Sequence, residues 1–546
     1  MRNFKLKRSV TLVAVSSLLS LTVVSIPTAA RAADPACATA NFVTTCVGAT
    51  TDTAPYMMMV PANFNGTVYL YSHGYRPNVP VPAGIPGYGG YTVTNTAEPA
   101  PGGSPAIIGA LLGKGYAVMG SGFARQGWNA DSAIKTNVEL IGLFKKQFTK
   151  TSKVVAWGNS LGGFITQALA EQYPNLISAA APLCMASDVA PLMTMAGDAL
   201  WGIKTFFDPT IKGGGYSAGA AGYAEAMGDL VKVFTVIGAM QANIAANPTA
   251  TAWPATSKVP DAIKAIPSRS ALVMVALMSG VPLQSAHFDS TSAAPGGTPA
   301  ERLGAQLAIY PSLAALENLA NAAALAVLAT HDLELQAGGA VFDNTATNYA
   351  ARIAEEQFIW ASALSGTSAT AGLLSVLAAS PRAKADPAAV AKLKTLASHS
   401  GKVEIPTILF TGTADPVTTP GNQQSVADKY AAYYAEKWAE AKAEKRKSGN
   451  YKKPANNQLV LWNFPPEKYT KFTATGAPDT SVPAATGTNH CNFTTSQYLA
   501  IADLLAYAAD NGKNLSGGAL LTKLRKAGNM TLDRGYSAPK LKFYGE

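Results

Sequence analysis

The stretch VVAWGNSLGG at residues 154–163 decides the predicted fold. Its apolar first half is typical of a buried strand, and it passes directly into a G-x-S-x-G pattern followed by helix-forming residues. A strand-to-helix turn this tight leaves no space for side chains at Gly158 and Gly162. It would raise the hydroxyl of Ser160 above the sheet and aim the backbone N–H of Leu161 toward the same point. The stretch therefore predicts a nucleophilic serine.

Short apolar runs on both sides of this stretch predict the rest of a sheet. The runs that are typical of buried strands lie at residues 67–72, 116–120, 153–157, 177–183, 407–411 and 458–463. Helical patterns lie at residues 104–114, 131–149, 161–172, 425–444 and 494–510. Nearly continuous apolar strands that alternate with helices are typical of a mostly parallel sheet. The expected fold class is therefore α/β.

The strand pattern stops for 220 residues between Cys184 and Glu404, which is far too long for a loop. This part of the chain is rich in Ala, Leu and Met and has helical periodicity at residues 218–245, 301–330 and 348–363. Because strands resume after it, we interpret residues 185–404 as a large, mostly helical cap inserted into one core, which residues 33–184 and 405–546 form. An independent second domain is the alternative. The start of the cap is rich in apolar residues, namely Met185, Leu192, Met193, Met195, Leu200, Trp201, Phe206 and Phe207.

The first 32 residues have the three parts of a secretory signal peptide. A basic start is followed by an apolar run at residues 10–24, and an Ala-Arg-Ala site ends at Ala32, after which we expect cleavage. The apolar run is shorter than the ~20 residues that span a bilayer, so we expect a secreted protein, extracellular or periplasmic, with no stable membrane anchor. Export permits disulfides, and we expect Cys37 and Cys46 to pair.

The composition limits the classes of partner. The chain is 48% hydrophobic and 14% charged, which excludes a disordered protein. Removing five basic residues with the signal peptide lowers the net charge from +10 to +5, and no basic stripe with interleaved aromatics is present. We therefore expect no nucleic-acid partner. No metal-ligand spacing and no nucleotide-binding glycine pattern occurs, so we expect no cofactor and no metal.

A nucleophilic serine needs a histidine base and an acid that orients it. The strand and turn at residues 405–415 end on Asp415, where the carboxyl end of a strand would present it beside Ser160. His490 is the histidine that follows the last strand, so the chain order Ser, Asp, His selects it as the base. A second N–H for an oxyanion hole, beside that of Leu161, would come from Tyr75 in the loop after an early strand.

Four short motifs together resemble the α/β-hydrolase superfamily, and they lie on both sides of the expected cap. They are HGY at 73–75, GNSLGG at 158–163, GTADP at 412–416 and NHC at 489–491. The resemblance implies the α/β-hydrolase fold and catalysis by Ser160, His490 and Asp415. The segment at residues 115–131 is similar to secreted bacterial esterases and to prolyl-oligopeptidase-like members.

The pair His490-Cys491 is similar to tannase and feruloyl-esterase-like enzymes, in which a cysteine after the histidine bonds one just before the serine. Asn159 occupies that second position here, so this chain departs from their pattern and tannase-type specificity does not carry over. Cys184 ends the strand after the nucleophile helix and would lie near the site. We therefore expect a disulfide between Cys184 and Cys491 that ties the histidine loop to the cap entrance.

Three functions are compatible with these residues. The first is a secreted serine esterase whose substrate has an apolar or aromatic acyl or alcohol part. The second is an exo-acting serine peptidase, which would need a cap carboxylate for the substrate ammonium. The third is a non-catalytic binding protein on the same fold. The carboxylates considered for the second function are Glu317, Glu334, Glu355 and Glu356. The oligomeric state is left open.

Overall fold

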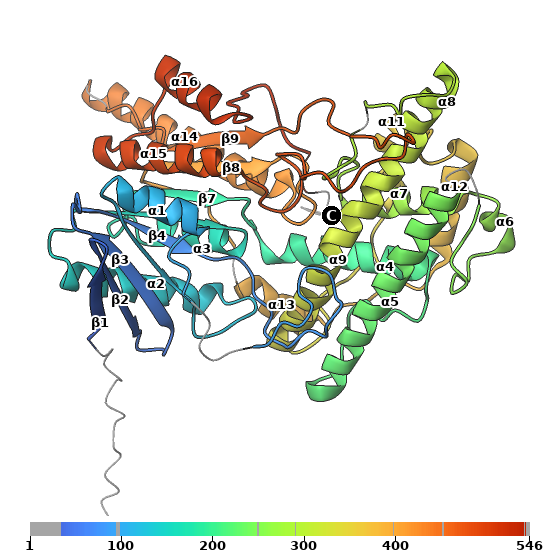
Figure 1. Ribbon diagram of the computed structural model, residues 1–546, viewed down its shortest axis with the longest axis horizontal. Coiled ribbons are helices and arrows are strands. Elements are labelled where there is room, and N and C mark those ends of the chain that lie inside the picture. Colours follow the sequence, from blue (N-terminus) through green and yellow to red (C-terminus); the bar gives the residue numbers. More distant parts are fainter. Residues whose placement is uncertain are drawn as a thin grey trace, which may run out of the picture.

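The computed structural model describes residues 34–93, 99–247, 251–289, 291–396, 398–449, 452–539 and 541. The expected signal peptide at residues 1–32 lies outside this part of the chain. Figure 1 shows a sheet with helices packed on it beside a second region that is built of helices.

One sheet carries the functional part of the molecule, and its strand order is β1-β2-β3-β5-β4-β6-β7-β8-β9. The strands are β1 (Ala36–Ala40), β2 (Val43–Ala49), β3 (Pro55–Pro61), β4 (Thr67–Ser72), β5 (Ala117–Ser121), β6 (Lys153–Asn159), β7 (Ala179–Leu183), β8 (Thr407–Gly412) and β9 (Gln458–Asn463). The neighbours β1–β2, β2–β3 and β3–β5 pair antiparallel. Every further pair across the sheet, from β5 to β9, is parallel. The expected α/β class with a mostly parallel sheet is confirmed.

The first three strands were not predicted, and they form the antiparallel edge of the sheet. Cys37 in β1 lies directly opposite Cys46 in β2, and the expected disulfide joins them. The bond therefore closes a hairpin at the sheet edge.

Helices cover both faces of the sheet because its strands are apolar on both sides. Side chains from α1 (Pro105–Gly113), α15 (Thr495–Asn511) and α16 (Gly517–Ala527) pack on one face. Side chains from α2 (Ala130–Gln147), α3 (Leu161–Gln172) and α14 (Pro420–Ser448) pack on the other. In β8, Ile408 and Phe410 face the first layer and Leu409 faces the second, as the alternation of a strand requires.

Among the described residues between β7 and β8, every named element is a helix, and we call this insertion the cap (Figure 1). Its elements are α4 (Val189–Phe206), α5 (Gly219–Ala246), α6 (Asp261–Lys264), α7 (Ser268–Ser279), α8 (Pro299–Gly304), a π-helical turn (Ala305–Ile309), α9 (Tyr310–Ala337), α10 (Tyr349–Arg352), α11 (Glu356–Ile359), α12 (Thr367–Ala379) and α13 (Pro387–Leu396). Most of them share one apolar core, to which Val81 and Ile85 from the segment after β4 also belong. The domain limits at residues 184 and 404 stay a prediction.

The continuous helical run at residues 299–337 is long and apolar enough to cross a membrane. Over half of its most apolar window, 56%, is buried inside the cap, where α9 packs against α4, α5 and α7. The core helix of a folded domain has the same length and composition.

The helix expected at residues 348–363 is wrong as a single element. The structure has only the short helices α10 and α11 there. Ile353 and Ala363 are buried, whereas Phe358 and Ile359 are 68% and 73% exposed. The stretch thus lacks a continuous apolar face to pack, and helix periodicity alone does not hold it together.

A hydrogen-bonded junction joins the cap to the loop between β9 and α15. Asp289 accepts hydrogen bonds from the backbone N–H groups of Tyr469 and Thr470, at 2.6 and 2.7 Å. Burial alone would raise the pKa of Asp289, but these N–H groups lower it well below its usual range. His287 also lies at the junction, with its ring Nε2 2.9 Å from the carbonyl oxygen of Val482. The junction fixes the cap against the loop that carries His490.

His399, after α13, is a buried histidine behind the nucleophile helix. Its ring centre lies 3.9 Å from that of Phe164 in α3. Burial, with a smaller contribution from Lys429, lowers the pKa of His399 to about 3. Glu171 does not offset this, because its oxygen is 3.9 Å from the ring and already accepts from the N–H of Gly401.

Acid is therefore expected to destabilise the protein through His399. An unfolded histidine takes up a proton near pH 6.5, whereas the folded one stays neutral until about pH 3. Stability that is present above pH 6.5 is then lost as the pH falls, by up to about 1.4 kcal/mol per pH unit. His399→Phe should flatten the fall of the melting temperature between pH 6.5 and 4. Equal slopes in the variant and the wild type would contradict this expectation.

Candidate active site

Ser160 sits on a strained turn between β6 and α3. Its backbone has φ 60° and ψ −122°, a region that a residue with a side chain rarely adopts. The turn is this tight because Gly158 and Gly162 have no side chains. A Cβ on Gly162 would lie 2.0 Å from the carbonyl oxygen of Ser72, and one on Gly158 would lie 2.5 Å from it. The turn places Ser160 at the carboxyl end of β6, with 8% of its surface exposed.

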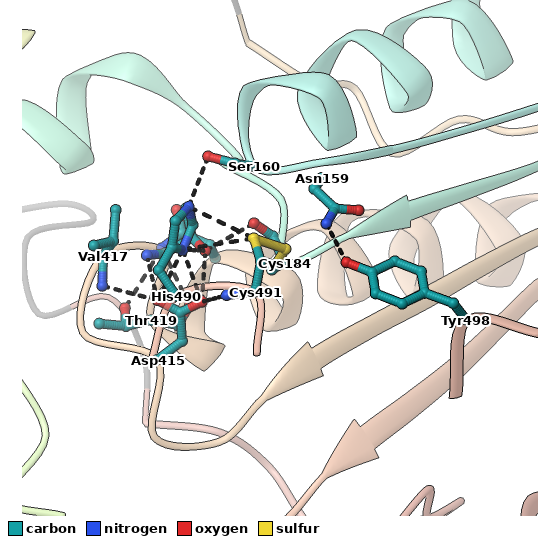
Figure 2. Close-up of polar contacts among 11 residues, drawn as sticks. Asn159, Ser160, Cys184, Asp415, Val417, Thr419, His490, Cys491 and Tyr498 are labelled. Atoms are coloured by element: carbon teal, nitrogen blue, oxygen red, sulfur yellow. Dashed lines mark hydrogen bonds and ion pairs between the residues drawn. A yellow bond between two sulfur atoms is a disulfide. The ribbon is translucent and has the colours of Figure 1, made fainter. Parts of the chain in front are cut away.

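The structure brings Ser160, His490 and Asp415 together at the carboxyl edge of the sheet (Figure 2). His490 Nε2 lies 2.8 Å from Ser160 Oγ, and His490 Nδ1 lies 2.9 Å from Asp415 Oδ2. Ser160 and Asp415 follow the ends of β6 and β8, and His490 lies in the loop after β9. Ser160 and His490 are 330 residues apart in the chain. This is the relative placement expected of a nucleophile, a base and an acid that orients the base.

Asp415 is held by the backbone around it. Its Oδ1 accepts hydrogen bonds from the N–H groups of Val417 and Thr418, at 2.8 and 3.0 Å. Its Oδ2 lies 3.2 Å from the hydroxyl oxygen of Thr418 and faces the histidine. The side chain is fully buried, so these bonds fix its orientation and supply the partners that a buried carboxylate needs. Thr418 is a residue that sequence reasoning missed.

The loops that carry the acid and the histidine lie backbone against backbone. Ala414 donates its N–H to the carbonyl oxygen of Gly487 at 3.0 Å and forms a bridge with Thr488. Gly487 has φ 84°, and a Cβ there would lie 2.6 Å from the carbonyl oxygen of Asn463. A glycine at 487 therefore allows the close approach that sets the distance between Asp415 and His490.

The expected disulfide between Cys184 and Cys491 is present beside the histidine (Figure 2). The carbonyl oxygen of Cys184 also accepts a hydrogen bond from Thr418 at 2.8 Å. Cys184 has a positive φ, as do Asn489 and Cys491 on either side of His490. Strained backbone thus gathers around the site, and the disulfide is one of the contacts that hold it there.

The described residues contain one group of potential metal ligands, and it is Asp415, His490 and Cys491. The sulfur of Cys491 is bonded to Cys184, so it is no thiolate ligand. The histidine and the carboxylate bond each other. The donor set therefore does not fit a metal ion.

Tyr75 and Leu161, the expected oxyanion-hole residues, line the same cavity as Ser160. Gly74 packs so closely on the nucleophile that a Cβ there would lie 3.3 Å from Ser160 Cβ. His73 is buried, and desolvation lowers its pKa to about 4, so the ring is neutral and lies against Gly74 and Gly122. The assignment of the two backbone N–H groups stays a prediction.

Asp332 in α9 anchors the Tyr75 loop to the cap, and sequence reasoning missed it. It accepts hydrogen bonds from the Trp128 N–H at 2.6 Å and from Asn78 Nδ2 at 2.7 Å, and its Oδ2 is 3.3 Å from the Tyr75 hydroxyl. Burial raises the pKa of Asp332 although hydrogen bonds from Trp128, Gln336 and Tyr75 oppose the rise. Trp128, Asn78 and Tyr75 lie more than 200 residues away in sequence, so no local pattern marks this anchoring role.

An apolar cavity opens on Ser160 between the core and the cap. The residues that line it are Tyr75, Trp128, Ser160, Leu161, Ala186, Val189, Leu192, Met193, Met195, Ala196, Ala199, Leu200, Ile203, Val281, Leu319, Ala322, Ala323, Leu325, Ala326, Ala329, Leu333, Pro416, Val417 and Thr418. None of these lining residues is charged. Four of the apolar residues singled out at the start of the cap contribute to the wall, whereas Phe206 and Phe207 are fully buried in the cap core.

Asn159, directly before the nucleophile, forms a hydrogen bond to the helix that follows His490. Its side-chain amide donates to the hydroxyl of Tyr498 in α15 (Figure 2). The contact links the nucleophile turn to the helix that follows His490. Nothing in the sequence around Asn159 predicted this contact with Tyr498.

Comparison with known proteins finds no matching family and no matching curated sequence. Solved structures do match. An esterase of Pyrococcus furiosus shares 12% identity over 29% of this chain and 56% of its own, with a TM-score of 0.20. Feruloyl esterase B from Aspergillus oryzae shares 11% identity over 82% of this chain and 73% of its own, with a TM-score of 0.31. Pyrococcus horikoshii acylaminoacyl peptidase shares 15% identity over 28% of this chain and 24% of its own, with a TM-score of 0.19. The chain thus spans about half of the first protein's length and a quarter of the third's.

These identities and TM-scores are too low to assign the fold. The features of the chain itself assign it. The sheet is parallel from β5 to β9, and Ser160 stands on a strained turn between a central strand and a helix. Asp415 and His490 follow in that order at the same edge. By these features, the chain has the α/β-hydrolase fold.

Proposed function

We propose that this protein is a serine hydrolase that cleaves carboxylic esters with an apolar acyl or alcohol group. The observation that supports this most strongly is the hydrogen-bonded series Ser160, His490 and Asp415 at the mouth of an uncharged cavity. The two disulfides are typical of an oxidising compartment, which agrees with export of the chain.

In the proposed reaction, Ser160 Oγ attacks the ester carbonyl carbon while His490 Nε2 takes its proton. Asp415 keeps the other ring proton on Nδ1 and stabilises the imidazolium that forms. His490 then gives its proton to the leaving alcohol, and the acyl group stays on Ser160. Water, activated by the same histidine, releases the acid.

The negative charge that develops on the carbonyl oxygen needs donors that are already in place. Leu161 is the first residue of α3, so its N–H has no partner within the helix and the helix dipole favours an anion there. We assign the second donor to the backbone N–H of Tyr75. Asp332 would act on this donor as a positioning residue, because it holds the Tyr75 loop against α9.

The cavity favours an ester over a peptide with a free amino terminus. An aminopeptidase binds the substrate ammonium with a carboxylate, because an unpaired charge is costly to bury. In the part of the chain that the structure describes, no carboxylate lines this cavity. Glu317 contacts His287, and Glu334 accepts hydrogen bonds from Gly215 and Tyr216. Glu355 and Glu356 do not line the cavity either.

A substrate panel on the purified mature protein tests the proposal. We expect turnover of p-nitrophenyl acyl esters and little or none of aminoacyl p-nitroanilides. A second series, of acetate esters with alcohols of increasing size, would show whether the cavity takes the acyl or the alcohol group. Faster cleavage of the anilides would favour the peptidase, and inertness toward both classes would favour a binding protein.

Narrowing the cavity should shorten the chains that the enzyme accepts. Ala326 in α9 lines the cavity and is half-buried, so Ala326→Trp would fill part of the cavity that Ser160 also lines. In whichever series shows chain-length dependence, we expect kcat/KM for the longest esters to fall about 10- to 200-fold while the shortest ester is cleaved as before. Ala224→Trp, on an exposed position of α5, is the matched control. An equal loss on short and long esters would contradict this role of the cavity.

A further inference from the structure

A second cavity lies in the cap and has a different chemistry from the one at Ser160. Its volume is about 780 Å³. It is formed by α4, α6, α12 and the segments next to them, in the part of the cap on the right of Figure 1. We call it the cationic cavity, and its lining residues are Trp201, Lys204, Thr205, Pro209, Lys212, Gly213, Lys258, Val259, Pro260, Ala262, Ile263, Phe342, Ser375, Val376, Ala379, Ser380, Pro381, Arg382 and Ala383.

Among the described residues, four cations and no carboxylate line this cavity. Lys212 is the one with an acidic partner in the described part of the chain, because its Nζ lies 2.7 Å from Glu225. Lys204 donates to the carbonyl oxygen of Lys212 at 3.2 Å, which leaves its charge uncompensated. Lys258 and Arg382 have no ion pair among the described residues. The cavity therefore carries a surplus of positive charge that its own wall does not neutralise.

The guanidinium of Arg382 is held between aromatic rings and has an unpaired donor. Its guanidinium carbon lies 5.1 Å from the ring centre of Trp201 and 4.9 Å from that of Tyr349, and the two rings are stacked. The aromatic faces hold the guanidinium in place. Its Nη1 is nevertheless buried without a hydrogen-bond partner. Asp198, which contacts the same Tyr349, binds Arg352 and the Tyr349 hydroxyl, each at 2.5 Å. A buried cationic donor of this kind gains most from an anion.

Apolar side chains make up much of the remaining wall, beside the hydroxyls of Thr205, Ser375 and Ser380. Trp201, Phe342, Ile263 and Val376 contribute side chains to it. A ligand that fits must therefore combine an anionic group with an apolar body. We propose that the cationic cavity binds an organic carboxylate with an apolar body, with Arg382 and Lys204 contacting the carboxylate.

The two cavities lie on different faces of α4. Leu200 and Ile203 line the cavity at Ser160, whereas Trp201 and Lys204 line the cationic cavity. The two can be occupied at the same time. Binding at the cationic cavity thus neither requires the proposed esterase reaction nor fails with it.

Calorimetric titration of the full-length mature protein tests the proposal, with benzoate, benzamide and inorganic phosphate as probes. We expect benzoate to bind once per chain, more weakly at high salt because the attraction is ionic. Benzamide lacks the charge and phosphate lacks the apolar body, so both should bind at least 10-fold more weakly. Ala326→Trp, which fills the other cavity, should leave benzoate binding unchanged.

Variants locate the site. Arg382→Gln and, independently, Lys204→Gln should each weaken benzoate binding about 10-fold or more, whereas Lys384→Gln, an exposed lysine two residues from Arg382, should not. Lys204→Gln keeps the test decisive if Arg382→Gln fails to fold. Benzoate binding that is unchanged in the folded variants, matched by benzamide or lost in Ala326→Trp would overturn the proposal, as would phosphate binding as tightly as benzoate.

Discussion

Ser160→Ala is expected to lower kcat/KM for p-nitrophenyl esters about 10⁴-fold or more while leaving the fold intact. The reason is geometric, since Ser160 Oγ is the hydroxyl within 2.8 Å of His490 Nε2 at the mouth of the apolar cavity. Alanine removes the nucleophile but keeps the Cβ, so the strained turn should still form. Initial rates over a range of substrate concentrations, with the melting temperature measured in parallel, check the prediction.

His490→Ala should cause a loss of similar size, and combining it with Ser160→Ala should add little, because the two side chains act in one step. Ser152→Ala, at an exposed position just before the same strand, is the matched control and should keep wild-type rates. Turnover near the wild-type value in Ser160→Ala would show that the reaction uses another nucleophile.

The second large effect is expected from removing the disulfide beside the histidine. Cys184 and Cys491 are separated by 307 residues, so breaking their bond frees a very long loop in the unfolded chain. The expected cost is about 4 kcal/mol of stability. The bond also fixes the residue next to His490, and a displacement of about 1 Å at such a site can cost about 100-fold in rate. Cys184→Ala/Cys491→Ala should therefore lose both stability and activity.

The other disulfide provides the control. Cys37 and Cys46 are nine residues apart in a hairpin at the edge of the sheet. Cys37→Ala/Cys46→Ala should cost less stability, because the loop is short, and it should leave kcat unchanged. The account of Cys491 as a support for His490 is wrong if both double variants keep full esterase activity below their melting temperatures.

Local chemistry explains which parts of the site could be predicted from sequence. The turn at Ser160 is encoded by two glycines within five residues, so its geometry is visible in the sequence. The order in which strand ends reach one edge of a parallel sheet made Asp415 and His490 the natural candidates to meet it. The pairing of Cys184 with Cys491 followed from the same reasoning, because both residues come after strands that end at this edge.

Contacts between distant segments that carry no motif could not be predicted. Thr418, Asp332 and Tyr498 support the site through partners that are far away in the chain or in a different element, and their own neighbourhoods carry no pattern. The antiparallel edge of the sheet was not predicted. Its strand β3 has the sequence PYMMMVP, and methionine gives little preference for a strand. The cationic cavity depends on Lys204, Lys258 and Arg382, which become neighbours only when the cap folds.

Covalent labelling tests the central claim most directly. The mature protein would be treated with a fluorophosphonate, digested and mapped by mass spectrometry, beside His490→Ala treated in the same way. The proposed mechanism predicts one adduct, on the peptide that contains Ser160, together with loss of esterase activity, and much slower labelling in His490→Ala. Complete loss of activity with the adduct on a different residue, or an active enzyme in which Ser160 stays unlabelled, would contradict it.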